Sequence, residues 1–200
     1  MRIVHLDAEL VVVDKPSGLL SVPGRSEPDC AWARVRALHA DALVVHRLDM
    51  ATSGLLLFAR GAAMQRALSL DFAERRVAKR YVAVVGGRLD AEGWQQIDLP
   101  LIADWPNRPL QKVDHELGKP STTRWRVLGH EAHGDAACSR LELEPITGRS
   151  HQLRVHLKAL GHPIVGDALY GGAPAPRLLL HASRLELPGR GLALSCPPEF

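Results

Sequence analysis

The sequence predicts an α+β fold in which helices pack on a mixed β-sheet. Two hydrophobic patterns support this prediction. Short apolar and β-branched runs, separated by Pro and Gly, recur along the 200 residues and are typical of strands. Between some of these runs, apolar residues recur at the spacing of three and four residues that marks one face of a helix.

The first third of the chain is predicted to begin with β-structure. Residues 3–13 read as a strand pair or one long strand, and they run into the turn signal Asp14-Lys15-Pro16-Ser17-Gly18. Residues 31–40 have helical spacing. Residues 43–45 and 55–59 are expected to form short buried strands.

The remaining elements alternate in the same way. Residues 62–80 carry apolar positions at helical spacing with five basic residues among them, which predicts a helix with a basic end. Later β-rich runs predict strands at 81–85, 122–128 and 139–144. A short helix is expected at 152–160, ending at Gly161.

Composition indicates an ordinary globular protein, because 46% of residues are hydrophobic and 24% are charged. We expect residues 1–200 to form one domain, since no repeat, linker or low-complexity tract interrupts them. The three cysteines have no paired spacing, so neither a disulfide framework nor a metal site is predicted. The absence of a long apolar run and of a signal peptide favours the cytoplasm and no membrane contact.

Two local clusters carry the chemically informative residues, whereas a net charge of +3 is only mildly basic. The first is His46-Arg47-Leu48-Asp49, which the flanking strands place in a loop. Asp49 is compatible with a nucleophile, a general base or a structural ion-pair partner. The small residues Thr52-Ser53-Gly54 that follow favour close approach of the backbone to a ligand.

The second cluster lies at residues 146–158 and is strongly basic. On the predicted helix, Arg154 and Lys158 share a face at a spacing of four residues, so their like charges repel. Phosphates or an internal acid must therefore lie near them. A solvated basic helix face is the alternative interpretation.

These residues also carry a family resemblance. The stretch 46–54 resembles the signature of RluA-type pseudouridine synthases, and residues 148–156 resemble the C-terminal motif of that family. Lys79-Arg80-Tyr81 is similar to its tyrosine motif, residues 14–18 to its N-terminal loop and residues 161–167 to its late loop. Several long motifs in the family's order span nearly the whole chain, which makes coincidence a poor explanation.

The resemblance implies a pseudouridine synthase fold, with a mixed, mainly antiparallel sheet, flanking helices and a central catalytic cleft. It also implies that Asp49 is the catalytic aspartate, that Tyr81 stacks on the target uracil and that Arg154 pairs with the aspartate. Arg47 matches the residue that fills the space left by a flipped nucleotide. Further RNA contacts are expected from residues of the same motifs and of one later loop, namely His46, Thr52, Lys79, Arg80, Arg108, Arg149 and His151.

The implied reaction isomerises uridine to pseudouridine and involves no net redox change or hydrolysis, so no cofactor is expected. A stacked target base must be flipped out of the RNA at a cost of about a few kcal/mol. A long cationic side chain such as Arg47 offsets this cost when it occupies the vacated stack. Tyr81 is expected to supply stacking worth roughly 1 to 3 kcal/mol per base.

Residues 104–113 indicate one branch of the family, because they look like a stretch found in a small branch of it. That branch modifies the tRNA anticodon stem-loop and a similarly shaped 23S rRNA hairpin, and both RNAs are expected as partners. The strand signal starts at Ile3, so we expect no N-terminal S4-type RNA-binding domain. Nothing in the sequence requires more than a monomer.

Other interpretations remain open from the sequence. A synthase restricted to large-subunit rRNA is one, and an RNA-binding or chaperone module with dispensable catalysis is another. A glycosidase-type hydrolase needs a second carboxylate, for which Glu142 and Glu144 are weak candidates because pairing with Arg140 or Arg124 is expected. The group His130, Glu131 and His133 matches no zinc spacing and is expected in an exposed hairpin loop. The four tryptophans are expected to anchor the core or loops.

Overall fold

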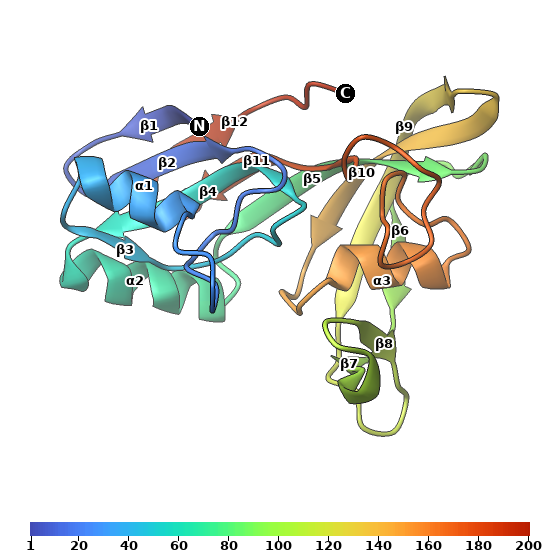
Figure 1. The fold of residues 1–200 in the computed structure, drawn as a ribbon, viewed down its shortest axis with the longest axis horizontal. Helices are drawn as coiled ribbons and strands as arrows, with labels where there is room; N and C mark the ends of the chain where they lie inside the picture. Colours follow the sequence, from blue (N-terminus) through green and yellow to red (C-terminus); the bar gives the residue numbers. More distant parts are fainter. The chain divides into compact units, whose positions relative to one another are not determined.

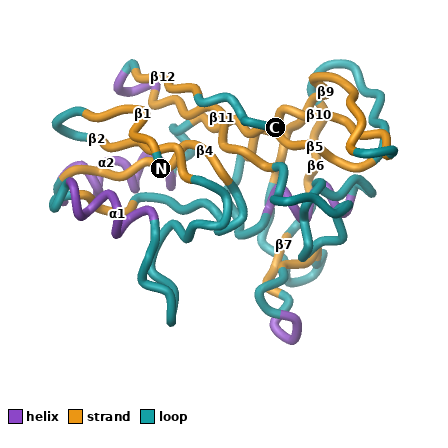
Figure 2. Tube along the Cα trace, turned by 45° about the horizontal axis from the view of Figure 1, so that its top comes forward, coloured by secondary structure: helices purple, strands orange, loops and turns teal.

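The structure is a computed structural model that describes residues 1–200. The chain forms two compact units. Unit 1 combines residues 1–79 with residues 181–200, and unit 2 consists of residues 80–180. Figure 1 shows the elements of each unit, and Figure 2 shows that strands and loops make up much more of the chain than helices.

Unit 1 is built on a mixed sheet with strand order β1-β2-β4-β11. β4 and β11 run parallel, and the other pairs in this unit are antiparallel. β3 adds to β4 and β12 adds to β11. The strands are β1 (Arg2–Leu6), β2 (Leu10–Lys15), β3 (Ala42–Val44), β4 (Ser53–Arg60), β11 (Leu180–Leu187) and β12 (Leu192–Ser195).

The central strands of unit 1 are buried on both faces, which explains their unbroken apolar runs. Helix α2 (Ala62–Ala73) places Leu68 in a core cluster with Leu57 of β4 and Leu185 of β11. Helix α1 (Ala31–Leu38) begins at Cys30, whose Sγ accepts a hydrogen bond from the Ala33 N–H. A 3-10 turn, η2 (Pro188–Arg190), joins β11 to β12.

Unit 2 contains an antiparallel sheet with strand order β5-β10-β9-β6. Its residues alternate between faces. Leu141 and Leu143 are buried on the face covered by α3, whereas Glu142 and Glu144 lie on the opposite face. The elements are β5 (Ala78–Gly86), β6 (Gln95–Asp98), β7 (Leu101–Ala103), η1 (Trp105–Asn107), β8 (Gln111–Val113), β9 (Thr122–His133), β10 (Ala136–Pro145) and α3 (Gln152–Ala159).

The α+β prediction and the mixed, mostly antiparallel sheet are confirmed. Residues 3–13 form a strand pair, and the helix predicted at 152–160 is α3. No helix of the chain has both the length and the apolar character needed to cross a membrane.

Two predicted boundaries are wrong. The helix expected over 62–80 ends at Ala73, because Arg75 adopts a left-handed backbone (φ 59°) and Val77 turns into the core of unit 1. Lys79 and Arg80 therefore lie on a strand. The exposed loop expected between Leu128 and Ser139 is only a short turn around Gly134, because β9 and β10 continue on either side of it.

Candidate active site

The loop that carries Asp49 connects β3 to β4, as predicted. Its backbone is held on both sides of Asp49 by the segment that follows β2. The buried Ser21 hydroxyl accepts a hydrogen bond from the Leu48 N–H (3.0 Å) and donates one to the Leu48 carbonyl (2.7 Å). On the other side, the Ser17 hydroxyl donates to the Ala51 carbonyl (2.6 Å).

Lys15 provides the deepest anchor of this loop, because its side chain is fully buried. The ammonium group donates to the carbonyls of Pro16 (2.9 Å), Leu19 (2.7 Å) and Met50 (3.0 Å). Burial lowers the pKa of Lys15 from 10.5 to about 8, and the negative charge of Asp49 opposes this shift. The turn at residues 14–18 thus ties the loop to β2.

His46 and Arg47 precede Asp49 but point to different surroundings. The His46 ring stacks on Phe72 with centroids 4.6 Å apart, and its Nε2 accepts a hydrogen bond from the Leu57 N–H (3.0 Å). Burial and the positive charge of Lys79 lower the pKa of His46 to about 3. The imidazole is therefore neutral with its proton on Nδ1, whereas Arg47 is exposed to solvent.

Among the small residues after Asp49, Gly54 packs closely against a neighbouring strand. Gly54 has φ 108°, and a Cβ atom at this position would lie 2.4 Å from the Ala182 carbonyl oxygen. Its close approach is therefore to the backbone of β11, which corrects the expectation of an approach to a ligand. Thr52 is buried at the end of the loop, and its N–H bonds the Asp49 carbonyl (3.1 Å).

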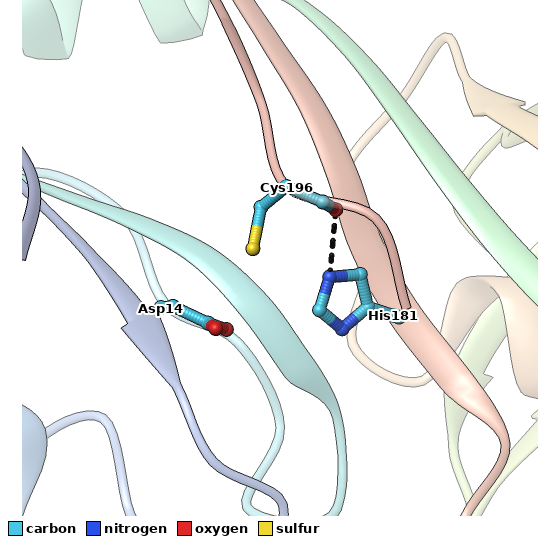
Figure 3. Close-up of side chains that lie close together, drawn as sticks. All are labelled: Asp14, His181 and Cys196. Carbon is cyan, nitrogen blue, oxygen red and sulfur yellow. Dashed lines mark hydrogen bonds between the residues drawn. The ribbon is translucent and has the colours of Figure 1, made fainter. Parts of the chain in front are cut away.

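Near this loop, Asp14, His181 and Cys196 bring potential ligand atoms within 4.8 Å of one another (Figure 3). Both ring nitrogens of His181 already have partners, the Ser53 hydroxyl (2.9 Å) and the Cys196 carbonyl (2.9 Å). Burial and Asp14 raise the pKa of the Cys196 thiol, which disfavours a thiolate ligand. We interpret this group as a hydrogen-bonded cluster that joins β2 to the C-terminal segment.

In unit 2, the predicted site residue Arg154 lies on the buried side of α3. Its Nε and Nη2 donate to the two carboxylate oxygens of Asp167 at 2.8 and 2.7 Å, with 5% and 0% of the side chains exposed. Such a bidentate pair fixes the guanidinium plane. Asp167 is the internal acid that the repulsion between Arg154 and Lys158 required, so a solvated basic face is excluded.

A buried tyrosine extends this arrangement. The Tyr170 ring lies under the Arg154 guanidinium at 5.0 Å, and its hydroxyl is 2.7 Å from His151 Nδ1. The same oxygen accepts the Gln111 N–H (2.9 Å), so it joins His151 to the backbone of β8. Unit 2 thus links Arg154 to the predicted RNA-binding residue His151 through Tyr170.

The tyrosine motif begins β5. Lys79 lies over the Phe72 ring at 6.0 Å, and burial lowers its pKa. Tyr81 is half-buried opposite Leu143 of β10. Arg80 forms an ion pair with Glu144. The guanidinium groups of Arg80, Arg124 and Arg126 all lie over the Trp94 ring.

The two acids considered for a hydrolase are held by arginines of this sheet face. Glu144 pairs with Arg124 (3.0 Å), as predicted, and Glu142 pairs with Arg126 (2.6 Å) rather than Arg140. Arg140 instead binds Glu131 (2.7 Å). These pairings leave the hydrolase interpretation without a free second carboxylate on this face.

The remaining predicted residues lie on the surface of unit 2. Arg149 is exposed and donates to the Pro120 carbonyl (3.4 Å). Arg108 is exposed on the hairpin of β7 and β8, where its guanidinium covers the Trp105 ring. His130 and His133 have separate carbonyl partners, Leu89 (2.9 Å) and Pro174 (3.2 Å).

Sequence reasoning missed the residues that hold the others in place, namely Lys15, Ser21, Asp167 and Tyr170. Lys15 and Asp167 do belong to the motifs at 14–18 and 161–167. A lone charged residue between buried apolar runs is a signal for such a role, because an unpaired buried charge is costly.

The mixed, mostly antiparallel sheet with its flanking helices places the chain in the α+β class. The model of one protein family, described as RNA pseudouridylate synthase, matches residues 9–159. The chain belongs to this family. It is an enzyme that isomerises uridine in RNA to pseudouridine.

Individual relatives agree with this assignment. The chain is 49% identical over 209 residues to the dual-specificity RNA pseudouridine synthase RluA of Escherichia coli K12, covering 99% of this chain and 93% of the relative. The protein of the same name from Pasteurella multocida is 47% identical, with coverages of 100% and 94%. The solved structure of human RNA pseudouridylate synthase domain containing 1 is similar, with a TM-score of 0.84, 30% identity, and coverages of 99% and 83%.

Proposed function

We propose that this synthase modifies two RNAs, a tRNA anticodon stem-loop and a 23S rRNA hairpin, and that Asp49 is its catalytic carboxylate. The relatives from Escherichia coli and Pasteurella multocida carry dual specificity in their names, which supports the first part. The stretch 104–113, which predicted this branch, spans strand β8 and the loop before it, which is exposed at residues 105–109. Recognition by RNA shape suits two targets that share a loop conformation.

The observation that carries the role of Asp49 is the anchoring of its loop. Neighbours on both sides, Leu48, Met50 and Ala51, have their backbone groups bound by Ser17, Ser21 and the buried Lys15. The Asp49 side chain is only half-buried. A group that reacts must be held within a narrow range of positions, and a fixed backbone with an accessible carboxylate meets this need.

The reaction breaks the bond between uracil N1 and ribose C1′ and forms a bond between C5 and C1′. The proton on C5 is released and N1 gains one, so atoms and charge balance without an oxidant, a reductant or a cofactor. A carboxylate serves in three routes: attack at C1′, attack at C6, or removal of a ribose proton. Each route requires the carboxylate of Asp49.

The other predicted roles are part of this proposal. Arg154, whose orientation Asp167 fixes, orients the catalytic aspartate, and Tyr81 stacks on the target uracil. The exposed Arg47 replaces the flipped nucleotide in the RNA stack. We also propose that residues 1–200 act as one catalytic domain, as a monomer in the cytoplasm.

The test is release of tritium from RNA labelled at uridine C5, with an anticodon stem-loop and an rRNA hairpin as substrates. Wild type is expected to release tritium from both, and Asp49→Asn from neither. Asp29→Asn is the matched control, because Asp29 lies in an exposed ion pair with Arg34.

Each contrary result has a distinct meaning. Release from the rRNA hairpin alone would reduce the proposal to an rRNA synthase. Equal release by wild type and Asp49→Asn would remove Asp49 from the mechanism. RNA binding without release from any uridine would indicate a binding module.

A further inference from the structure

Trp105 departs from the behaviour expected of a tryptophan in this chain. Trp125 is buried, and Trp32 anchors a loop through a hydrogen bond from its indole N–H to the Ala42 carbonyl (3.0 Å). Trp105 is 63% exposed. Tryptophan is enriched at binding surfaces, where its large ring contacts a partner, so the exposed ring of Trp105 is a candidate contact.

The hairpin that carries Trp105 is well defined. Strands β7 and β8 pair, and the turn η1 lies at the far end of the hairpin from the main sheet of unit 2 (Figures 1 and 2). The connecting loop closes on itself through backbone bonds from Asp104 to Leu110 (2.9 Å) and from Asn107 to Asp104 (3.0 Å). Trp105 is therefore presented by a loop with its own fixed backbone.

The side chain of Arg108 covers one face of the Trp105 indole. Its guanidinium carbon lies 3.2 Å from the centroid of the Trp105 ring, close enough to stack on it. Arg108 itself is exposed and forms no ion pair with an acidic side chain. One face of Trp105 is thus covered by a cation, and the indole still retains most of its exposure to solvent.

The base of the hairpin is fixed to the helix that carries Arg154. Leu110 and Val113 pack against Leu101, Val155 and Tyr170. The Tyr170 hydroxyl accepts the Gln111 N–H at 2.9 Å. A ligand bound at the tip of the hairpin is therefore held at a defined place relative to α3.

We propose that Trp105 and Arg108 form a stacking site for an unpaired nucleotide of the substrate RNA. The nucleobase stacks on the exposed indole face, and the guanidinium donates hydrogen bonds to a neighbouring phosphate. The ligand class is single-stranded RNA in a loop or bulge, because paired bases do not offer their faces. This inference rests on the proposed RNA substrates and adds a binding site outside the catalytic residues.

The experiment measures the dissociation constant of a fluorescently labelled anticodon stem-loop by anisotropy. Trp105→Ala is expected to weaken binding about 10- to 100-fold, and Trp105→Phe, which keeps an aromatic face, is expected to stay within a few-fold of wild type. The RNA concentration that gives half-maximal tritium release should rise with the dissociation constant in Trp105→Ala and stay near the wild-type value in Trp105→Phe. A blunt RNA duplex is the second probe, and there Trp105→Ala should have no effect.

Arg108→Ala is expected to weaken binding and to reduce the salt dependence of the association constant by about one ion, as loss of one phosphate contact does. Two matched controls come from α1. Leu38→Ala removes an apolar side chain that is 73% exposed, and Arg36→Ala removes an arginine that lies over Trp32. Both should bind RNA like wild type.

Wild-type affinity in Trp105→Ala would overturn the inference. So would an equal loss on the stem-loop and the blunt duplex, because stacking on an unpaired base is then not the interaction removed. If Trp105→Ala melts at a lower temperature, Trp105→Phe and Arg108→Ala decide the question. Failure of the proposed function looks different, since tritium release is then absent from wild type while the binding difference persists.

Discussion

Each unit buries a cationic side chain at or beside a predicted site residue, Lys15 in unit 1 and Arg154 in unit 2. The two charges are compensated in different ways. In unit 1, the Lys15 ammonium is surrounded by backbone carbonyls. In unit 2, the Arg154 guanidinium has a full counter-charge in Asp167. Carbonyl dipoles compensate only part of the cost of burying a charge, and a bidentate carboxylate compensates more of it.

This difference teaches where the molecule is sensitive to pH. The ammonium of Lys15 loses its proton near pH 8, since burial lowers its pKa to about that value. A guanidinium stays charged at any pH at which the protein is folded. We therefore expect pH to act on the loop of Asp49 in unit 1, whereas the orientation of Arg154 in unit 2 persists.

The largest loss of stability is expected from removing the Arg154–Asp167 ion pair in unit 2. Asp167→Asn removes the bidentate carboxylate partner of the buried Arg154 and should lower the free energy of unfolding by about 3–5 kcal/mol. Denaturant unfolding measures this loss. The control is Asp90→Asn, which removes an exposed pair with Arg88 and should leave the free energy of unfolding nearly unchanged. A similar small loss in both variants would mean that the Arg154 pair is no stronger an anchor than a surface pair.

Lys15→Met tests the arrangement in unit 1 and should cost about 1–3 kcal/mol at pH 7, because carbonyls of Pro16 and Leu19 lose their donor. Between pH 8 and 10.5, the unfolded wild-type chain holds a proton on Lys15 that the folded chain does not. Wild-type stability therefore rises with pH in this window, by on the order of 3 kcal/mol. The variant lacks this rise, so its deficit should grow from pH 8 to 10.5. A deficit independent of pH would contradict the assignment.

His46→Gln makes a smaller change in the same unit. It replaces the acceptor of the buried Leu57 N–H and should cost about 1–2 kcal/mol at pH 7. The folded pKa of His46 is about 3 and its ordinary value is 6.5, so the unfolded chain binds the extra proton between these values. Wild type loses stability as pH falls through this range, by more than the deficit at pH 7. Thermal melts should therefore show the difference vanish about one pH unit below 6.5 and reverse at lower pH. A constant difference from pH 7 to pH 4 would refute a His46 that stays neutral in the folded protein.

The smallest effect is expected where charges meet on an open sheet face. Glu142→Gln removes the partner of Arg126, whose side chain is 44% exposed, and should change stability by roughly 0.2–1 kcal/mol. Added salt should shrink the difference further. A loss as large as that of Asp167→Asn would show that exposure does not separate the two kinds of ion pair.

Sequence patterns predicted the elements well where burial is uniform. β2 and β4 are buried on both faces, so their apolar runs are continuous and easy to recognise. The helix at 62–80 was predicted too long because the spacing of apolar residues continues past Ala73. Only the left-handed backbone at Arg75 ends it, and arginine gives no local signal for that conformation.

For the candidate site, the sequence predicted positions set by neighbouring residues but not contacts between distant ones. Asp49 was placed correctly in its loop because flanking strands bracket it. The partner of Arg154 within unit 2 could not be identified, because Asp167 comes 13 residues later on a separate loop. Periodicity reports which face a residue occupies and not which distant side chain meets it. The approach of Gly54 to β11 is invisible for the same reason, since Ala182 lies far along the chain.

The parallel pairing of β4 with β11 also has a consequence for how the chain is made. The core of unit 1 includes Leu185, Leu187 and Cys196, which a ribosome adds after every residue of unit 2. During synthesis, the apolar faces of β2 and β4 therefore stay incompletely covered while residues 80–180 leave the ribosome and form their own contacts. The start of β4, where Ser53 bonds His181 and Gly54 packs on Ala182, acquires its final packing only when synthesis reaches the last strands.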